Sequence, residues 1–138
     1  MTANRQAAIL HPADIKAKDR GGGIRTVPLV TSGVGSTSLL NGVTTLEPGA
    51  AVPLHIHNCE ESVLVLSGSA RVHIDGREQD VQPGDVTFIP TGVPHFFRNI
   101  SDREPMSIFW TYASIDATRT ILATGVTTRI DEEHGAAR

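Results

Sequence analysis

Two histidines that are two residues apart are the first sign of chemistry in this sequence. His55 and His57 lie in a stretch that is predicted to be a strand, residues 52–57. Side chains at positions i and i+2 of a strand point to the same face, so the two imidazoles project together. Such a pair can bind a divalent metal ion, but it also occurs on solvated strand faces. The pair alone leaves both interpretations open.

A carboxylate and a third histidine extend this pair. Glu61 begins the next predicted strand after a short loop, and His95 begins a later strand after a proline-rich turn. If the strands close into a barrel, the four side chains can meet inside it. Three imidazoles and one carboxylate suit a divalent first-row metal. An octahedral ion held in this way keeps two positions open, which is typical of a reactive site rather than a closed structural one.

The elements that must position these residues are predicted to be β-strands. The chain is rich in Val, Ile and Thr, and 13 Gly and 8 Pro interrupt it at short intervals. The clearest hairpin joins residues 71–74 and 77–81 through Asp75-Gly76, a pair that favours the type I′ turn. Turn signals at this spacing predict an all-β sandwich or barrel.

Length, charge and cysteine content exclude several classes of protein. The 138 residues fit a single domain, and one cysteine excludes both an internal disulfide and a zinc site built on several thiolates. A net charge of −3 argues against nucleic acid as the main partner. The sequence shows no apolar run of membrane-spanning length and no secretory signal, so we expect no membrane partner and a cytoplasmic protein.

The chain divides into three predicted segments. Residues 1–20 read as an N-terminal arm, 21–112 as the β-barrel domain, and 113–138 as a C-terminal extension outside the core. The extension contains strand-like pieces at 119–123 and 126–130 and a weak helical pattern at 131–137. Because edge strands of small sandwiches need covering, the arm and the extension predict a homodimer in which the extension packs at the interface.

The spacing of glycines, histidines and prolines resembles the two motifs of the cupin family. The first, G-x5-H-x-H-x3,4-E-x6-G, is matched by Gly49, His55, His57, Glu61 and Gly68. The second, G-x5-P-x-G-x2-H-x3-N, is matched by Gly84, Pro90, Gly92, His95 and Asn99. The short spacer between the motifs is similar to that of small single-domain bacterial cupins.

The resemblance implies a double-stranded β-helix, or jelly-roll barrel, with one divalent transition metal (Fe, Mn, Ni or Zn) at its centre. The implied metal ligands are His55, His57, Glu61 and His95, and Glu61 is also a candidate proton acceptor. Alternation with His95 turns Phe97 inward and makes it a candidate pocket wall. Asn99 is expected to hydrogen-bond at a turn or strand end rather than to bind metal.

For the remaining residues of interest we expect structural or solvated roles rather than a part in the site. Cys59 is expected to be a loop residue, His73 a surface residue, and His11 and His134 solvated residues of the two tails. The sequence leaves open whether Phe109 or Trp110 faces inward.

Two classes of function follow from this site. The first is a small metalloenzyme that acts on a small oxygenated substrate, of the dioxygenase, isomerase or decarboxylase type, with the dioxygenase type favoured. The second is a binding or sensing module for a sugar or carboxylate without turnover. An open metal site favours the enzyme, although a fold alone does not identify a reaction.

Overall fold

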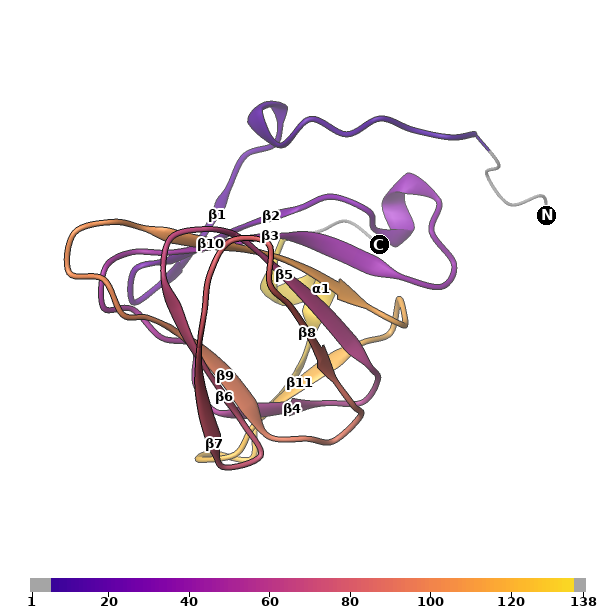
Figure 1. Ribbon diagram of the computed structural model, residues 1–138. Helices are drawn as coiled ribbons and strands as arrows, with labels where there is room; N and C mark the ends of the chain where they lie inside the picture. The colour runs from indigo at the N-terminus through magenta and orange to yellow at the C-terminus, as the bar shows by residue number, and fades with distance from the viewer. Residues whose placement is uncertain (1–5, 136–138) are drawn as a thin grey trace.

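A computed structural model describes residues 6–135 of the chain, and these residues form two antiparallel sheets that face each other (Figure 1). The first sheet has the order β1 (Lys18–Gly21), β2 (Ile24–Pro28), β3 (Leu40–Leu46), β10 (Met106–Tyr112), β5 (Glu61–Ser67) and β8 (Val86–Ile89). The second has the order β12 (Thr127–Arg129), β11 (Thr118–Ile121), β4 (His55–His57), β9 (His95–Asn99), β6 (Ala70–Ile74) and β7 (Arg77–Val81). The predicted all-β jelly-roll barrel is therefore confirmed.

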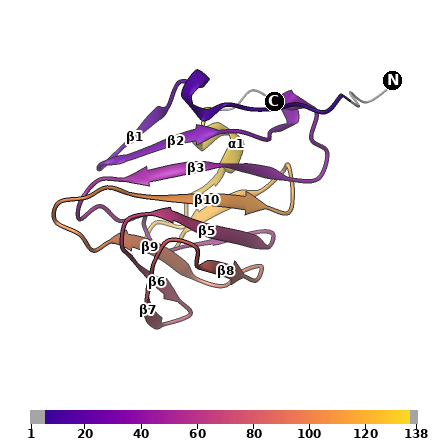
Figure 2. The same cartoon turned by 45° about the horizontal axis from the view of Figure 1, so that its top comes forward.

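Short helical turns complete the described part of the chain. Two 3₁₀ turns lie at Pro12–Asp14 and Ser32–Val34, and one helix, α1, spans Ile130–Glu133. Figure 2 shows α1 behind β2 and β3, beside the first sheet. None of these helices is long and apolar enough to cross a membrane.

The core lies between the two sheets, where alternate residues of each strand point inward. In both β3 and β10 every second residue is buried, and the inward positions of β10 are Met106, Ile108, Trp110 and Tyr112. The open question about Phe109 and Trp110 is thus settled in favour of Trp110. Its ring packs directly against Gly42, where a Cβ atom would lie 2.6 Å from the ring. Trp110 also donates a hydrogen bond from Nε1 to the Thr44 hydroxyl, at 2.8 Å, which fixes the ring against β3.

The hairpin between β6 and β7 has the turn that its sequence predicts. Asp75 and Gly76 have φ angles of 51° and 80°, so both central residues are in the left-handed region that a type I′ turn needs. This turn sets the register of β6, which pairs in turn with β9 and places Ile74 opposite His95.

The C-terminal segment belongs to the barrel, and the expectation that it lies outside the core is wrong for its described part. β11 pairs with β4, with Arg119 opposite His57 and Ile121 opposite His55. Ala117 and Ile130 are each 1% exposed and are part of the core. The reason is that β4 would otherwise leave one edge unpaired, and β11 satisfies its backbone groups.

The N-terminal arm also joins the sheet at its end, because β1 pairs with β2 and the boundary predicted at residue 20 falls within β1. Residues 1–5 and 136–138 of the two predicted tail segments lie outside the described residues. The homodimer stays a prediction.

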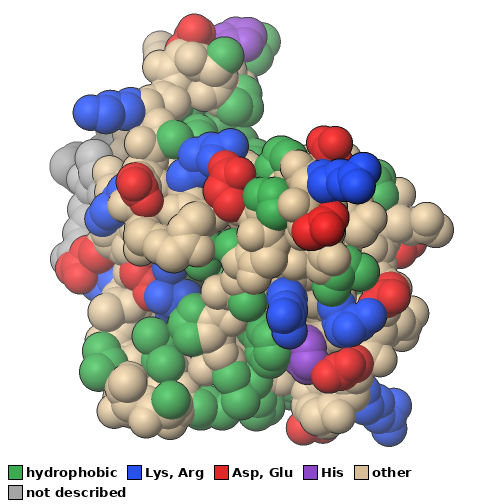
Figure 3. Space-filling view, turned by 90° about the vertical axis from the view of Figure 1, so that its left-hand side faces the viewer, with side chains coloured by type: hydrophobic (Ala, Val, Ile, Leu, Met, Phe, Trp, Pro, Cys, Tyr) green, Lys and Arg blue, Asp and Glu red, His purple; other side chains and the backbone are tan. Residues whose placement is uncertain are grey.

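One face of the molecule carries gathered hydrophobic side chains beside an area of mixed acidic and basic ones (Figure 3).

The side chain of Asn99 gives a test of how this fold is held. Asn99 is fully buried, and its amide donates to the backbone carbonyls of Leu46 and Glu104, at 3.0 and 2.8 Å. Its own carbonyl oxygen accepts from the Ser101 N–H at 2.9 Å. Asn99→Ala removes these three buried hydrogen bonds to backbone groups, so we expect it to lower the free energy of unfolding by about 3 kcal/mol, measured by urea denaturation.

Asn58→Ala is the matched control for this prediction. Asn58 also links two backbone groups, the Asp116 carbonyl and the Thr118 N–H, but it is exposed, so water can replace it. Its loss is expected to cost about 1 kcal/mol or less. Equal losses for the two variants would contradict the role given to Asn99.

Candidate metal centre and pocket

Four side chains from three strands meet in the centre of the barrel. β4 presents His55 and His57 on its inner face with Ile56 between them on the other side, and β9 places His95 directly opposite His55. The ring centroids lie 4.3 to 5.0 Å apart, and one ring nitrogen from each of the three histidines falls within 4.8 Å of the others. Glu61, the first residue of β5, brings its carboxylate to the same point.

A hydrogen bond to a backbone carbonyl orients each of the three rings. Nδ1 of His55 lies 2.6 Å from the Pro53 oxygen, Nδ1 of His57 lies 2.9 Å from the Thr118 oxygen, and Nδ1 of His95 lies 2.8 Å from the Val93 oxygen. A carbonyl oxygen only accepts, so each Nδ1 carries the hydrogen. In the neutral rings the lone pair is then on Nε2, which faces the shared centre.

The electrostatics of the cluster favour neutral His55 and ionised Glu61. Burial lowers the pKa of His55 to about 3, and the neighbouring His95 and His57 act in the same direction. Burial by itself raises the pKa of Glu61, but the His57 and His95 rings beside the carboxylate outweigh this effect. The pKa of Glu61 therefore lies below its usual range.

The contacts among these groups fit a bound metal cation. Nε2 of His95 lies 3.0 Å from the Glu61 carboxylate, although the hydrogen of a neutral His95 is already used at Nδ1. Two acceptors this close need a proton or a cation between them. Nε2 of His57 is buried without a hydrogen-bond partner, 3.6 Å from the same oxygen. One divalent ion would satisfy these acceptors together, and three imidazole nitrogens with one carboxylate are a first-row metal donor set.

A small cavity of about 40 Å³ adjoins this cluster. Of the four predicted ligands His55, Glu61 and His95 line it, and Phe97, 2% exposed, forms part of its wall as the alternation of β9 predicts. Its other lining residues are Arg20, Thr44, Val52, Val63, Ile108, Trp110, Tyr112, Arg119, Glu133 and His134.

Tyr112 is a site residue that the sequence did not reveal. It is the last residue of β10, its ring centroid lies 4.7 Å from that of His57, and it is buried. Burial, followed by the charge and hydrogen bonding of Glu61, raises the pKa of Tyr112 well above its usual value. Its hydroxyl therefore keeps its proton and can donate a hydrogen bond in the cavity.

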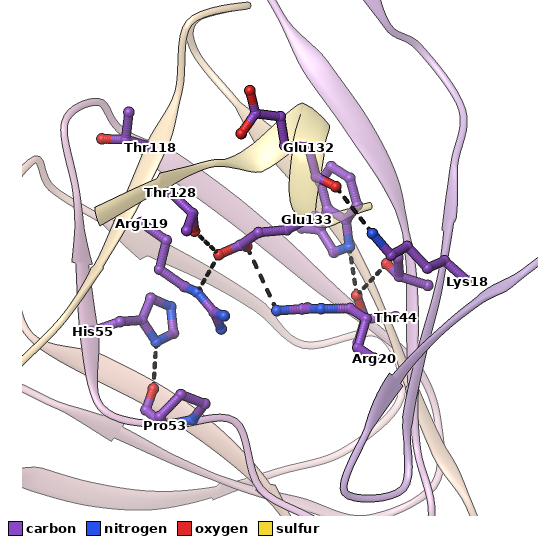
Figure 4. Close-up of polar contacts among 12 residues, drawn as sticks. Lys18, Arg20, Thr44, Pro53, His55, Thr118, Arg119, Thr128, Glu132 and Glu133 are labelled. Carbon is purple, nitrogen blue, oxygen red and sulfur yellow. Dashed lines mark hydrogen bonds and ion pairs between the residues drawn. The ribbon is translucent and has the colours of Figure 1, made fainter. Parts of the chain in front are cut away.

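A second polar group, made of Arg20, Arg119 and Glu133, was also missed (Figure 4). Nε of Arg119 donates to the Glu133 carboxylate at 2.8 Å, and a terminal nitrogen of Arg20 lies 3.5 Å from its other oxygen. Burial lowers the pKa of Arg20, and the like charge of Arg119 adds to this effect. The signal that could have found Arg119 is the pairing of β11 with β4, which requires the C-terminal segment to be placed in the barrel.

The expectation that His134 is solvated is wrong. Its side chain is 4% exposed and stacks on Trp110, with ring centroids 4.4 Å apart. It is buried because α1 packs its end against the barrel rather than extending into solvent. By contrast, His73 lies at the surface hairpin, stacked on Phe96, and Cys59 is half-buried against the core.

This architecture, a jelly-roll barrel with three inward histidines and a carboxylate, is the one that the sequence motifs imply, and comparison with known proteins agrees. The family model described as "Cupin domain" matches residues 42–112. The chain is 33% identical over 106 residues to "Protein SchB" of Streptomyces halstedii, a match that covers 76% of this chain and 77% of SchB. The chain belongs to the cupin family.

Two further similarities describe its neighbourhood. The chain is 34% identical over 93 residues to "Polyketide synthase CurC" of Streptomyces cyaneus, and this match covers 67% of this chain but only 60% of that protein's length. The structure of the polyketide cyclase RemF from Streptomyces resistomycificus superposes with a TM-score of 0.73 at 22% identity, covering 91% of this chain and 86% of RemF. At this identity the superposition shows a shared fold.

The burial of His134 predicts a pH dependence of stability. Burial, followed by the charges of Arg20 and Arg119, lowers the pKa of His134 well below its usual value of 6.5. The folded state therefore binds fewer protons than the unfolded state below pH 6.5, and stability falls as the pH drops through that value. His134→Phe keeps a ring against Trp110 but removes this titration. Relative to wild type, it should gain about 2 kcal/mol of unfolding free energy between pH 6.5 and pH 5.

The measurement is urea denaturation of both proteins at pH 8, 6.5 and 5. Between pH 8 and 6.5 the unfolding free energies of the two proteins should change nearly in parallel, because His134 is then largely neutral in both the folded and the unfolded state. A difference that stays constant down to pH 5 would contradict the assignment of His134 as a buried neutral group.

Proposed function

We propose that this cupin is a mononuclear metalloenzyme that acts on a small oxygenated substrate. The observation that carries the proposal is the set of three Nε2 atoms held toward one point by backbone carbonyls, with the Glu61 carboxylate beside them. Three of these four residues also line a cavity. A metal ion bound here would border that cavity rather than be enclosed by protein on all sides, so the site supports chemistry rather than a closed structural role.

His55, His57, Glu61 and His95 would hold the metal, which when bound supplies Lewis acidity or, as iron, redox chemistry. The chain's own residues account for the other requirements. The Glu61 carboxylate beside the histidines is the candidate proton acceptor for a substrate, and the protonated Tyr112 hydroxyl can donate a hydrogen bond to a substrate oxygen. The apolar side chains of Val52, Phe97 and Ile108 line the same space and would shield a bound substrate from water.

The reaction types that we consider are dioxygenation, isomerisation and decarboxylation. Each begins with a substrate whose oxygens can lie against a metal and whose proton can move to a nearby base. The name of the relative CurC refers to polyketide synthesis, and polyketides are chains of alternating carbonyl groups. This supports β-dicarbonyl compounds as one substrate class, together with the catechols and flavonols that suit a dioxygenase.

Metal content tests the site directly. We expect the natively purified protein to hold about one divalent transition metal per chain and the double variant His55→Ala, His57→Ala to hold none, because it loses two of four ligands. Elemental analysis by mass spectrometry after gel filtration is the measurement. His73→Ala is the control, because His73 lies at the surface hairpin and should leave the metal content unchanged. Unchanged metal in the double variant would refute the site.

Turnover tests the enzyme class. We expect the metal-loaded protein to convert at least one of acetylacetone, catechol or quercetin. Conversion is measured by product analysis, and oxygen consumption is measured in parallel with an oxygen electrode. Oxygen uptake indicates a dioxygenase, and product without uptake indicates an isomerase or another reaction that consumes no oxygen. Glu61→Gln, compared at equal metal content, should lower kcat by about 10²-fold or more if Glu61 takes the proton. Binding of these compounds by calorimetry without any product would instead support the non-catalytic binding module.

A further inference from the structure

The cavity beside the metal centre is too small for a substrate as it stands. Its volume of about 40 Å³ is room for one or two water molecules. Any organic ligand that reaches the metal centre must therefore move a lining side chain. The question is which side chain can leave, and what chemistry remains behind it.

The polar end of the cavity is built from two arginines that come from unrelated parts of the chain. Arg119 lies on β11 directly opposite His57, and residues that face each other across an antiparallel ladder point to the same side. Arg20 is the extra residue in a bulge of β1, where the pairing steps from Asp19 opposite Arg25 to Gly21 opposite Ile24. Such a bulge re-aims a side chain, and here the Arg20 side chain is only 13% exposed.

Both arginines are occupied by one carboxylate of the chain itself. Glu133, the last residue of α1, receives Nε of Arg119 at 2.8 Å, lies 3.5 Å from Arg20, and also accepts the hydroxyl of Thr128. Its side chain is 9% exposed. A carboxylate held by two guanidinium groups is the arrangement by which proteins recognise a small organic acid.

A second observation marks the same place as a ligand site. Nδ1 of His134, which lines this cavity, is buried and has no hydrogen-bond partner. Buried polar atoms are rarely left unpaired unless a ligand, ion or water satisfies them. This ring nitrogen is therefore available to a polar group that enters the cavity.

The charges on the lining favour an anion once Glu133 has moved. The charged side chains of the described lining are Arg20, Glu61, Arg119 and Glu133, which sum to zero. Without Glu133 the balance is one positive charge before any metal is counted, and a divalent ion would add two more. Buried charge of this sign requires a counter-ion.

Glu133 can leave without unfolding the segment that carries it. Ile130 anchors α1 in the core, and Asp131 anchors it through an ion pair with Arg129 at 2.9 Å. The described bonds that hold the Glu133 carboxylate inward are those to Arg119, Arg20 and Thr128. A rotation of the Glu133 side chain would break these contacts, release the two arginines and enlarge the cavity.

We propose that the pocket binds a small carboxylate ligand through Arg20 and Arg119, in the place that Glu133 occupies, so that Glu133 acts as an internal competitor for its own site. The inference rests on the proposed function, because the opposite end of such a ligand would face the histidine cluster. It narrows the substrate class to oxygenated compounds that carry a carboxylate.

The test is calorimetric titration of the metal-loaded protein with glycolate, and with glycolamide as its uncharged counterpart. Glu133→Gln removes the competing charge, so glycolate should bind about tenfold more tightly than to wild type. Arg119→Met and Arg20→Met should each weaken glycolate binding about tenfold. Glycolamide should bind all four proteins more weakly and with no such order.

Glu132→Gln is the matched control, because it makes the same charge change on the exposed neighbouring residue of α1, outside the cavity lining. It should bind glycolate as wild type does. Thermal unfolding of each variant shows whether it is folded, and the arginine variants test the proposal even if Glu133→Gln does not fold.

Three results would overturn the proposal. They are no glycolate binding to either wild type or Glu133→Gln, the same affinity in the arginine variants as in wild type, or an equal gain in Glu132→Gln. The second would mean that glycolate binds elsewhere or to the metal alone. Metal content, measured on the same samples, reports separately on the proposed metal site, so loss of glycolate binding at full metal content refutes the anion site alone.

Discussion

Burying a carboxylate beside three imidazoles in the middle of a β-barrel is the constraint on which this molecule depends. Glu61 and the three histidines are each 6% exposed or less, so bulk water does not solvate them. Taking such groups out of water is costly unless they are paired. The barrel meets the requirement in two ways. Backbone carbonyls take up every Nδ1 hydrogen, and the Nε2 atoms with the Glu61 oxygen form a set of acceptors suited to one cation.

The rest of the fold serves the geometry of this cluster. Pairing of β4 with β9 sets His55 against His95, and pairing of β5 with β10 places Glu61 opposite Tyr112. The turn before His95 is tied to β4 by the hydrogen bond from the Gly92 N–H to the His57 carbonyl, at 3.0 Å. Strands β4, β5 and β9 thus deliver four side chains through ladders that admit a single register.

The centre of the barrel could be predicted from the sequence because its signals are local or closely spaced. The alternation around His55 and His57, the Asp75-Gly76 turn and the inward direction of Phe97 each follow from the period of a strand or the φ angles of a turn. The cavity-lining residues Arg20 and His134 could not be predicted in this way. Arg20 faces inward because of a bulge, and His134 is buried because a short helix packs on the barrel. Neither has a periodicity that marks it, since each depends on which strands become neighbours.

The hydrogen bond from His57 to the Thr118 carbonyl joins the histidine cluster to β11, so the length of the chain before β11 affects the site. On one strand, His57 is a predicted ligand. On the facing strand, Thr118 orients that ligand and Arg119 reaches into the cavity. A shift of β11 by one residue would turn Arg119 outward and bring a different carbonyl to His57, so both ends of the pocket would change at once. The loop of residues 113–117 is therefore constrained in length. A single residue inserted or deleted there would change both the arginine in the cavity and the carbonyl that orients His57.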